Sequence, residues 1–184
     1  YFDNLVSVII ESNPDNAELI TSFGANCQNE HYYEGAEYYY KKAIEINGYS
    51  AKVYNNLGVA YSKRKMFDEE IAAYKMAIDL DHTYEDGYFN LGIAYGSKGM
   101  VDEEIRSYQK VIELDSKSSE AFYNLGHAYR GKEMYDESIA VFKKAIEINP
   151  TLVDAYFNLG VSYGKKGLFS KLSNGIIRGT YCIN

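Results

Sequence analysis

The sequence predicts an all-α solenoid built from antiparallel helix pairs. Three observations support this fold class. One short block recurs at a fixed interval, a second block with helical periodicity follows most copies, and there are only 2 Pro in 184 residues to interrupt helices. Because a single helix hairpin cannot bury its apolar face alone, stacked copies must share a continuous core.

The first block sets the period and the first helix of each pair. The segments YNNLGVAY, YFNLGIAY, FYNLGHAY and YFNLGVSY begin at residues 54, 88, 122 and 156, always 34 residues apart. In the second copy, Tyr88, Leu91 and Tyr95 fall on one face of a helix expected over residues 85–98. Gly92 lies on the same face without a side chain, so a second helix can approach closely.

The second block predicts the other helix of each pair. The segments DEEIAAYKMAIDL, DEEIRSYQKVIEL and DESIAVFKKAIEI begin at residues 68, 102 and 136. Ile105, Tyr108 and Val111 have helical spacing within a helix expected at about residues 102–115. The segment GSKGM, with Gly96 and Gly99, is expected to form the turn between the two helices.

The period also predicts the domain organisation. The repeat array covers 1–169, and 170–184 is a tail with no repeat phase. Within the array we assign a partial repeat at 1–16, full repeats at 17–50, 51–84, 85–118 and 119–152, and a half repeat at 153–169. A half repeat leaves apolar surface uncovered, so we expect the tail or another chain to cover it. Since the sequence opens with Tyr1, we interpret it as a fragment or a processed form.

The period, the Leu-Gly-x-x-Tyr core and the spacing of alanine and aromatic residues resemble the tetratricopeptide repeat family over roughly residues 1–169. The resemblance implies a right-handed superhelix whose first helices line a concave groove. It also exposes departures. Glu70 and Glu104 replace a small residue, and we expect them to reach solvent or bond a nearby tyrosine. Cys27 replaces a tyrosine, and we expect a buried, inert thiol.

A second stripe of residues runs along the first helices, and the resemblance places it in the groove. We call it the groove stripe and take it as the candidate peptide-binding site. Its members are Asn55, Asn56, Val59 and Lys63, then Phe89, Asn90 and Ile93, then Tyr123, Asn124, His127 and Arg130, then Phe157, Asn158 and Val161.

Four members of the groove stripe form an asparagine ladder, with one residue per repeat: Asn56, Asn90, Asn124 and Asn158. An asparagine amide can donate and accept at once, which suits a peptide backbone. Each contact is worth a net ~0.5–1.5 kcal/mol. The ladder is similar to that in the tetratricopeptide superhelix of O-linked N-acetylglucosamine transferase. The alternative is that the asparagines only bond neighbouring helices.

The groove residues also indicate the kind of ligand. The carboxylate clamp by which some family members hold acidic chaperone tails is disfavoured, because its basic positions hold other residues: Thr21, Asn55, Asp86, Asn90, Glu120 and Asn124. Aromatic and aliphatic groove residues with an acidic edge favour an extended, neutral-to-basic peptide with some apolar anchors.

Several classes of function are disfavoured. A net charge of -7 argues against nucleic acid and anionic membrane surfaces as partners, and no apolar run is long enough to span a bilayer. His31, His82 and His127 fit no metal-ligand spacing, and the 2 Cys form no disulfide framework. We therefore expect no enzyme activity, no cofactor and no metal, and a cytoplasmic location.

The sequence thus predicts a protein–protein interaction scaffold that binds an extended peptide segment of a partner in the groove. Two alternatives stay open. The chain could be the substrate-recognition arm of a larger enzyme, such as a glycosyltransferase. It could also self-associate through the open ends of the repeat array.

Overall fold

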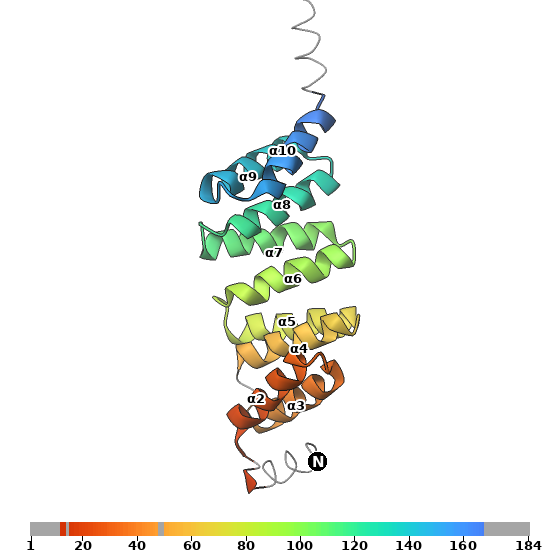
Figure 1. Cartoon of the computed structure of the whole chain (residues 1–184), viewed down its shortest axis with the longest axis vertical. Helices are drawn as coiled ribbons and strands as arrows, with labels where there is room; N and C mark the ends of the chain where they lie inside the picture. Colours follow the sequence, from red (N-terminus) through yellow and green to blue (C-terminus); the bar gives the residue numbers. More distant parts are fainter. Residues whose placement is uncertain (1–11, 14, 48–49, 168–184) are drawn as a thin grey trace, which may run out of the picture. The chain divides into compact units, whose positions relative to one another are not determined.

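The computed structural model describes residues 12–13, 15–47 and 50–167 (Figure 1). Within these ranges the regular structure is entirely α-helical, which confirms the predicted fold class. The helices are α2 (Ala17–Asn29), α3 (Tyr33–Ile46), α4 (Ala51–Lys63), α5 (Phe67–Leu80), α6 (Glu85–Ser97), α7 (Val101–Leu114), α8 (Ser119–Gly131), α9 (Tyr135–Ile148) and α10 (Val153–Lys165). The helices expected at 85–98 and 102–115 correspond to α6 and α7.

The chain divides into two compact units after Ala94, inside α6. In the N-terminal unit α2 packs on α3, α3 on α4, and α4 on α5. In the C-terminal unit α7 packs on α8, α8 on α9, and α9 on α10. Figure 1 shows antiparallel pairs joined by short turns in each unit. Because these contacts join helices that are consecutive in sequence, the packing within each unit is that of a repeat solenoid.

Polar side chains fix where several first helices begin. The Asn16 side chain accepts a hydrogen bond of 2.9 Å from the backbone N–H of Leu19, at the start of α2. Ser50 caps α4 and Ser118 caps α8 in the same way. Such caps satisfy backbone donors that have no partner inside the helix. The helix starts are therefore set locally by the sequence.

The turns within the helix pairs share one backbone conformation. Lys65, Gly99 and Glu133, which are 34 residues apart in sequence, have φ angles of 59°, 71° and 60°. In each turn the N–H of the following methionine donates to the carbonyl of a tyrosine in the first helix, as Met100 does to Tyr95 at 2.9 Å. This bond closes the helix end in the manner of a Schellman motif. The turn predicted around Gly96 and Gly99 is confirmed.

Glycines allow the two helices of a pair to approach closely. A Cβ atom added to Gly58 in α4 would lie 2.4 Å from Cε1 of Tyr74 in α5. A Cβ atom on Gly126 in α8 would lie 2.5 Å from Cε1 of Phe142 in α9. Both aromatic rings are buried, with 2% and 0% of their surface exposed. Each glycine thus makes room for a large ring at the centre of its helix pair.

Two carboxylates enter the helix contacts at positions where other copies have Ala36 and Ser138. Glu70 is 2% exposed, and its side chain is hydrogen-bonded to Ser62. The sequence had suggested that Glu70 reaches solvent or bonds a tyrosine. Instead, the side chain is buried and its partner is a serine. In the C-terminal unit, a Cβ atom on Gly96 would lie 2.9 Å from the carboxylate of half-buried Glu104. Burial is the main cause that raises the pKa of both glutamates.

Two further expectations meet the structure only in part. The Cys27 side chain is half-buried, and not fully buried as expected. The half repeat leaves large side chains at the surface of α10, where Tyr156 is 50% exposed and Phe157 is 71% exposed. The tail that was expected to cover this surface lies outside the described residues.

Candidate functional site

The groove stripe lies on the first helix of each pair, namely α4, α6, α8 and α10, and its members differ widely in exposure. Lys63, Ile93 and Phe157 are exposed. Asn55 and Asn158 are buried, with 7% and 8% of their surface exposed. The half-buried members are Asn56, Val59, Phe89, Asn90, Tyr123, Asn124, His127, Arg130 and Val161. The stripe is therefore only in part an open surface.

In the N-terminal unit one ladder residue bonds another member of the stripe. The Asn90 side chain on α6 donates from Nδ2 to Oδ1 of Asn55 on α4, at 2.9 Å. An asparagine amide carries two N–H donors and an oxygen with two lone pairs. Asn90 thus commits one of its donors to the contact between the two helices. The bond also gives the buried Asn55 oxygen a partner.

In the C-terminal unit a ladder residue is held more tightly. Asn158 donates from Nδ2 to the backbone carbonyl of Asp154 at 2.8 Å and to the Tyr123 hydroxyl at 3.4 Å. Its Oδ1 accepts from Nη1 of Arg130 at 2.6 Å. Both amide donors and one lone pair are therefore in use. Asn158 joins α8 to α10 and has little capacity left for a ligand.

His127 completes this polar cluster on α8. Nη2 of Arg130 lies 3.0 Å from Nδ1 of His127. A guanidinium only donates, so Nδ1 must accept and the ring proton of a neutral His127 sits on Nε2. Nε2 is buried and lacks a hydrogen-bond partner in the part of the chain that the structure describes. Burial, followed by the charge of Arg130, lowers the pKa of His127, while Asp154 opposes the shift.

Aromatic rings hold the histidine in place. The Tyr123 ring meets the His127 ring edge to face, with centroids 4.7 Å apart. The buried Phe142 ring meets it at 5.6 Å, also edge to face. Such arrangements are favoured by the charge distribution of aromatic rings. The cluster is thus a fixed part of the α8–α9 contact.

Asn56 and Asn124 differ from the other two ladder residues. Both are half-buried, and neither side chain has a hydrogen-bond partner among the residues that the structure describes. The structure therefore separates the ladder into two residues bonded to neighbouring helices and two that are not.

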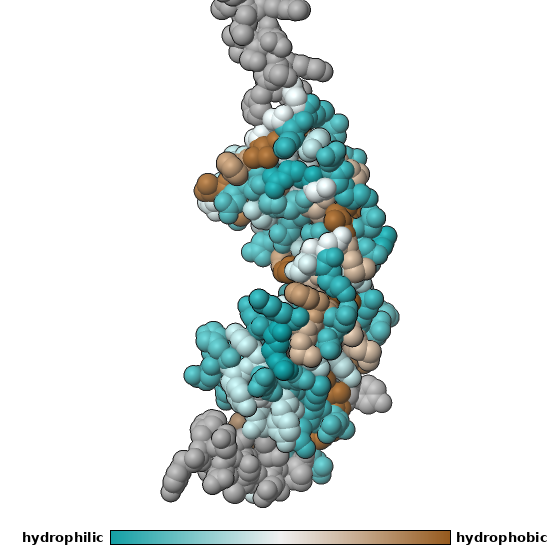
Figure 2. Space-filling model, turned by 90° about the vertical axis from the view of Figure 1, so that its right-hand side faces the viewer, coloured by the Kyte–Doolittle hydropathy of each residue, from teal (hydrophilic) through white to brown (hydrophobic). Residues whose placement is uncertain are grey.

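The surface around the stripe is acidic at most repeats. The second residue of each first helix is Glu18, Lys52, Asp86, Glu120 or Asp154, and all five are exposed. Hydrophilic residues cover most of the face seen in Figure 2, and hydrophobic residues reach the surface in separate places. Exposed apolar members of the stripe include Ile93, with 44% exposure. The stripe thus offers isolated apolar contacts beside acidic groups.

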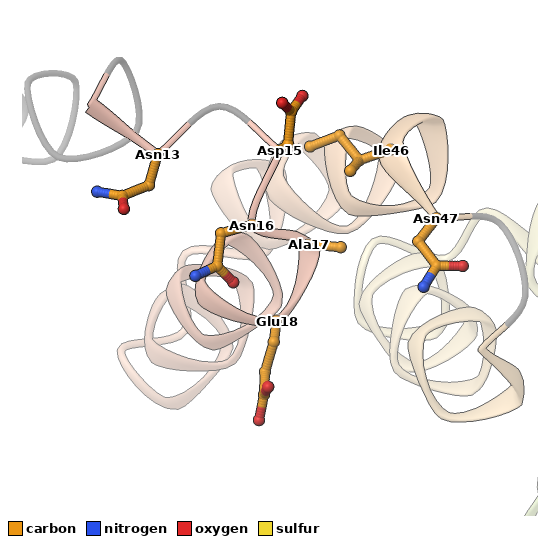
Figure 3. A pocket seen from close by; sticks show the side chains of 7 residues that line it. All are labelled: Asn13, Asp15, Asn16, Ala17, Glu18, Ile46 and Asn47. Carbon is orange, nitrogen blue, oxygen red and sulfur yellow. The ribbon is translucent and has the colours of Figure 1, made fainter.

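Two neighbouring cavities open at the N-terminal ends of the first two repeats. A broad one of about 910 Å³ is lined by Asn13, Asp15, Asn16, Ala17, Glu18, Ile46 and Asn47 (Figure 3). A smaller one of about 280 Å³ is lined by Ala17, Glu18, Thr21, Ala43, Asn47, Ser50, Lys52 and Val53. This second pocket was not predicted from the sequence. The signal was Thr21, because Asn55, Phe89 and Tyr123 are the larger residues at its repeat position.

The described residues contain no group of three or more His, Cys, Asp or Glu side chains arranged to hold a metal ion. Across those same residues, none of the helices combines the length and apolar character needed to span a bilayer.

Models of the tetratricopeptide repeat match the sequence in several overlapping places. One, described as TPR repeat, matches residues 67–99 and 126–167. Two others, described as tetratricopeptide repeat, match residues 39–72 and 107–140, and residues 85–118. Together the matches run without a gap from residue 39 to residue 167.

Solved structures with the same fold include three at 25% identity or more, two of MamA and one of YrrB. A crystal structure of MamA is 30% identical with a TM-score of 0.76, and the match covers 80% of this chain and 86% of that one. A crystal structure of YrrB, described as a TPR protein with an unusual peptide-binding site, is 25% identical with a TM-score of 0.76. That match covers 88% of this chain and 83% of YrrB. A search among curated proteins gives no match.

Proposed function

The chain belongs to the tetratricopeptide repeat family, and we propose that it is a protein–protein interaction scaffold that binds an extended segment of a partner along the groove stripe. The observation that carries this proposal is the state of Asn56 and Asn124. Both amides lie on the stripe without a partner among the described residues. The similarity to YrrB, described as having a peptide-binding site, supports the same function.

The chemistry of the stripe suggests how a peptide is held. The amides of Asn56 and Asn124 can each donate to a backbone carbonyl and accept from a backbone N–H. Exposed Ile93 and Phe157 offer apolar contacts at other repeats. The acidic residues beside the stripe favour a neutral-to-basic segment. In this proposal the chain binds and carries out no chemistry of its own.

The experiment uses a phage-displayed library of random peptides, panned on the immobilised chain. Enriched peptides are synthesised, and their affinities are measured by fluorescence polarisation. We expect Asn56→Ala/Asn124→Ala to weaken binding by about tenfold or more, since two contacts of ~0.5–1.5 kcal/mol each are lost. A library that yields no enriched peptide, or peptides bound equally by the double variant, would contradict the proposal.

Asn90 and Asn158 are poorer choices for this test. Removing the Asn90 amide leaves the buried Asn55 oxygen without its partner, and removing the Asn158 amide leaves Nη1 of Arg130 without its acceptor. Either change would lower stability and binding together. Asn56→Ala/Asn124→Ala keeps those bonds, and its thermal unfolding measured by circular dichroism should match that of the parent.

A second candidate function is self-association through α10. Val153, Tyr156 and Phe157 are 74%, 50% and 71% exposed, and large apolar side chains gathered at a surface favour association. Light scattering over a range of protein concentrations tests this. A rise in mass that Val153→Lys/Tyr156→Lys abolishes would support it, whereas a constant monomer mass would exclude it.

A further inference from the structure

We propose that the pocket of about 280 Å³ between α2 and α4 is an anchor site for one apolar side chain of a bound peptide. The peptide carries a basic residue on one side of that anchor and an acidic residue on the other. This inference rests on the proposed function, because it names the ligand chemistry of one part of the peptide-binding face. It goes further by extending the peptide-binding face to α2, where Thr21 stands at the repeat position of the stripe residues Asn55, Phe89 and Tyr123.

One residue that lines the pocket is smaller than its counterparts in the later repeats. Thr21 stands where the following repeats have Asn55, Phe89, Tyr123 and Phe157. A larger side chain at residue 21 leaves less room beside Ala17 and Val53, which also line the pocket. The small size of Thr21 therefore sets this helix apart from the first helices that follow it.

The floor of the pocket suits an apolar group. Ala17, Ala43 and Val53 line it, and Ala43 and Val53 are buried, with 1% and 7% exposure. The Thr21 hydroxyl already donates to the backbone carbonyl of Ala17 at 2.7 Å, which leaves its methyl group as the apolar part. An engineered apolar cavity of about 150 Å³ binds benzene. The larger pocket here accommodates a branched aliphatic or aromatic side chain.

The rim of the pocket carries two opposite charges. Glu18 on α2 and Lys52 on α4 both line it, and both are exposed. Neither side chain forms an ion pair with any residue in the described ranges. Lys52 is also the single basic residue at its repeat position, where the other copies have Glu18, Asp86, Glu120 and Asp154. The charge pattern therefore complements a ligand with one positive and one negative group.

The broader cavity next to the anchor pocket carries a second acidic group. It shares Ala17, Glu18 and Asn47 with the anchor pocket and adds Asp15. In Figure 3 the carboxylates of Asp15 and Glu18 point in opposite directions from the start of α2, and of the two only Glu18 lines the anchor pocket. A basic side chain that leaves the pocket past α2 therefore meets Glu18, and an acidic side chain that leaves it past α4 meets Lys52.

Backbone geometry sets the spacing of the three side chains. In an extended peptide, alternate residues face the same side and lie about 6.6 Å apart, at about 3.3 Å per residue. The anchor and its two charged neighbours must therefore be separated by one residue each. The expected motif is basic-x-apolar-x-acidic, read in one chain direction or the other.

The test uses two capped pentapeptides, acetyl-Lys-Ala-Leu-Ala-Glu-amide and its reversed sequence. A third, acetyl-Lys-Ala-Glu-Ala-Leu-amide, has the same composition without the central anchor. Binding is followed by amide chemical shifts in a ¹H–¹⁵N titration of the whole chain. We expect one of the first two to shift the signals of Thr21, Ala43 and Val53 at lower concentration than the third. Equal shifts from all three, or none up to the solubility limit, would overturn the proposal.

Variants that copy other repeats fill or invert the pocket. Thr21→Phe introduces the phenylalanine that stands at this repeat position in Phe89 and Phe157. We expect its ring to fill the pocket and the affinity for the peptide to fall by about tenfold or more. Thr21→Ser is its matched control and should keep the affinity of the parent. Lys52→Glu changes an exposed residue and does not require side chains to repack, as Thr21→Phe does. It should lower the affinity for the peptide by about threefold to tenfold. Binding that survives both Thr21→Phe and Lys52→Glu overturns the assignment.

Failure of the pocket and failure of the proposed function give different results. Suppose the panned peptides bind, depend on Asn56 and Asn124, and ignore Thr21→Phe. The groove function then stands and the anchor pocket is wrong. If panning enriches nothing while the pentapeptides bind in the pocket, the pocket stands and the groove function is wrong.

Discussion

Arg130 donates a hydrogen bond of 2.6 Å from Nη1 to Oδ1 of Asn158, across the contact between α8 and α10. This bond divides the asparagine ladder into structural and available members. Asn158 is buried and bonded on both sides of its amide. Asn124, one repeat earlier, lies half-buried without such partners in the described part of the chain.

The two asparagines should therefore respond differently to substitution. Asn158→Ala leaves Nη1 of the half-buried Arg130 guanidinium without its acceptor, while Nη2 keeps its contact with His127, so we expect the free energy of unfolding to fall by about 1–3 kcal/mol. Asn124→Ala, the matched change at the same repeat position, should alter it by less than about 0.5 kcal/mol. Urea unfolding followed by circular dichroism measures both. Equal losses would show that the Arg130 bond adds no stability.

The glycines at the centre of the helix pairs should tolerate no side chain. Gly126→Ala brings a methyl group within 2.5 Å of the Phe142 ring, and we expect a loss of about 1–3 kcal/mol from overpacking. Gly131→Ala is the control, because an added Cβ there meets no atom within 4 Å among the described residues. We expect that change to be neutral or stabilising by up to about 1 kcal/mol. In thermal unfolding, the melting temperature of Gly126→Ala should fall, while that of Gly131→Ala should stay the same or rise.

Replacing the turn residue Glu133 by glycine should stabilise the folded chain. Its φ of 60° lies in the left-handed region, which costs a residue with a side chain about 1–2 kcal/mol. Glycine avoids this cost but loses more chain entropy on folding, so we expect Glu133→Gly to gain about 0.5–1 kcal/mol. Gly99→Ala makes the reverse change at the same turn position and should destabilise. A less stable Glu133→Gly in chemical unfolding would refute the turn argument.

Buried Glu70 should make stability fall as the pH rises. Burial raises its pKa above the usual 4.5, and the hydrogen bond from Ser62 only partly opposes the shift. The folded chain therefore binds the proton more tightly than the unfolded chain. The stabilisation is complete below pH 4.5 and is lost as the pH rises from there through the raised pKa.

Glu70→Gln removes this titration and isolates its effect. We expect the variant to gain stability relative to the parent between pH 4.5 and neutrality, as measured by urea unfolding at several pH values. Glu69→Gln, at an exposed neighbour, is the control. A constant difference between Glu70→Gln and the parent across this range would argue against a buried titrating carboxylate.

His127 should be neutral, with its proton on Nε2, at neutral pH. The Arg130 contact requires Nδ1 to accept, and burial with the Arg130 charge holds the pKa of His127 below its usual 6.5. Its contribution to stability is therefore present above pH 6.5 and is lost as the pH falls through the lowered pKa. Long-range ¹H–¹⁵N spectra of the imidazole nitrogens report the tautomer and the pKa. A proton on Nδ1, or a pKa at or above 6.5, would contradict the arrangement.

The helices, the turns between them and the pairing of consecutive helices follow from the amino-acid sequence alone. These features depend on contacts between residues near one another in the chain, such as the cap of Asn16 on Leu19 or the turn bond from Met100 to Tyr95. A 34-residue period then copies each local arrangement along the chain. The repeat pattern is therefore enough to predict the fold class.

The contacts made by the residues at a repeated position depend on how the helices pack. Asn90 meets Asn55 and Asn158 meets Arg130 across 35 and 28 residues of sequence, and each bond depends on the side chain that the neighbouring repeat presents. Identical asparagines thus differ, because Asn90 and Asn158 bond neighbouring helices while Asn56 and Asn124 have no such bond among the described residues. The pocket at Thr21 arises in the same way, from small residues that come together only when α2 and α4 pack. A period predicts where a side chain stands, while its neighbours determine whether it can bind.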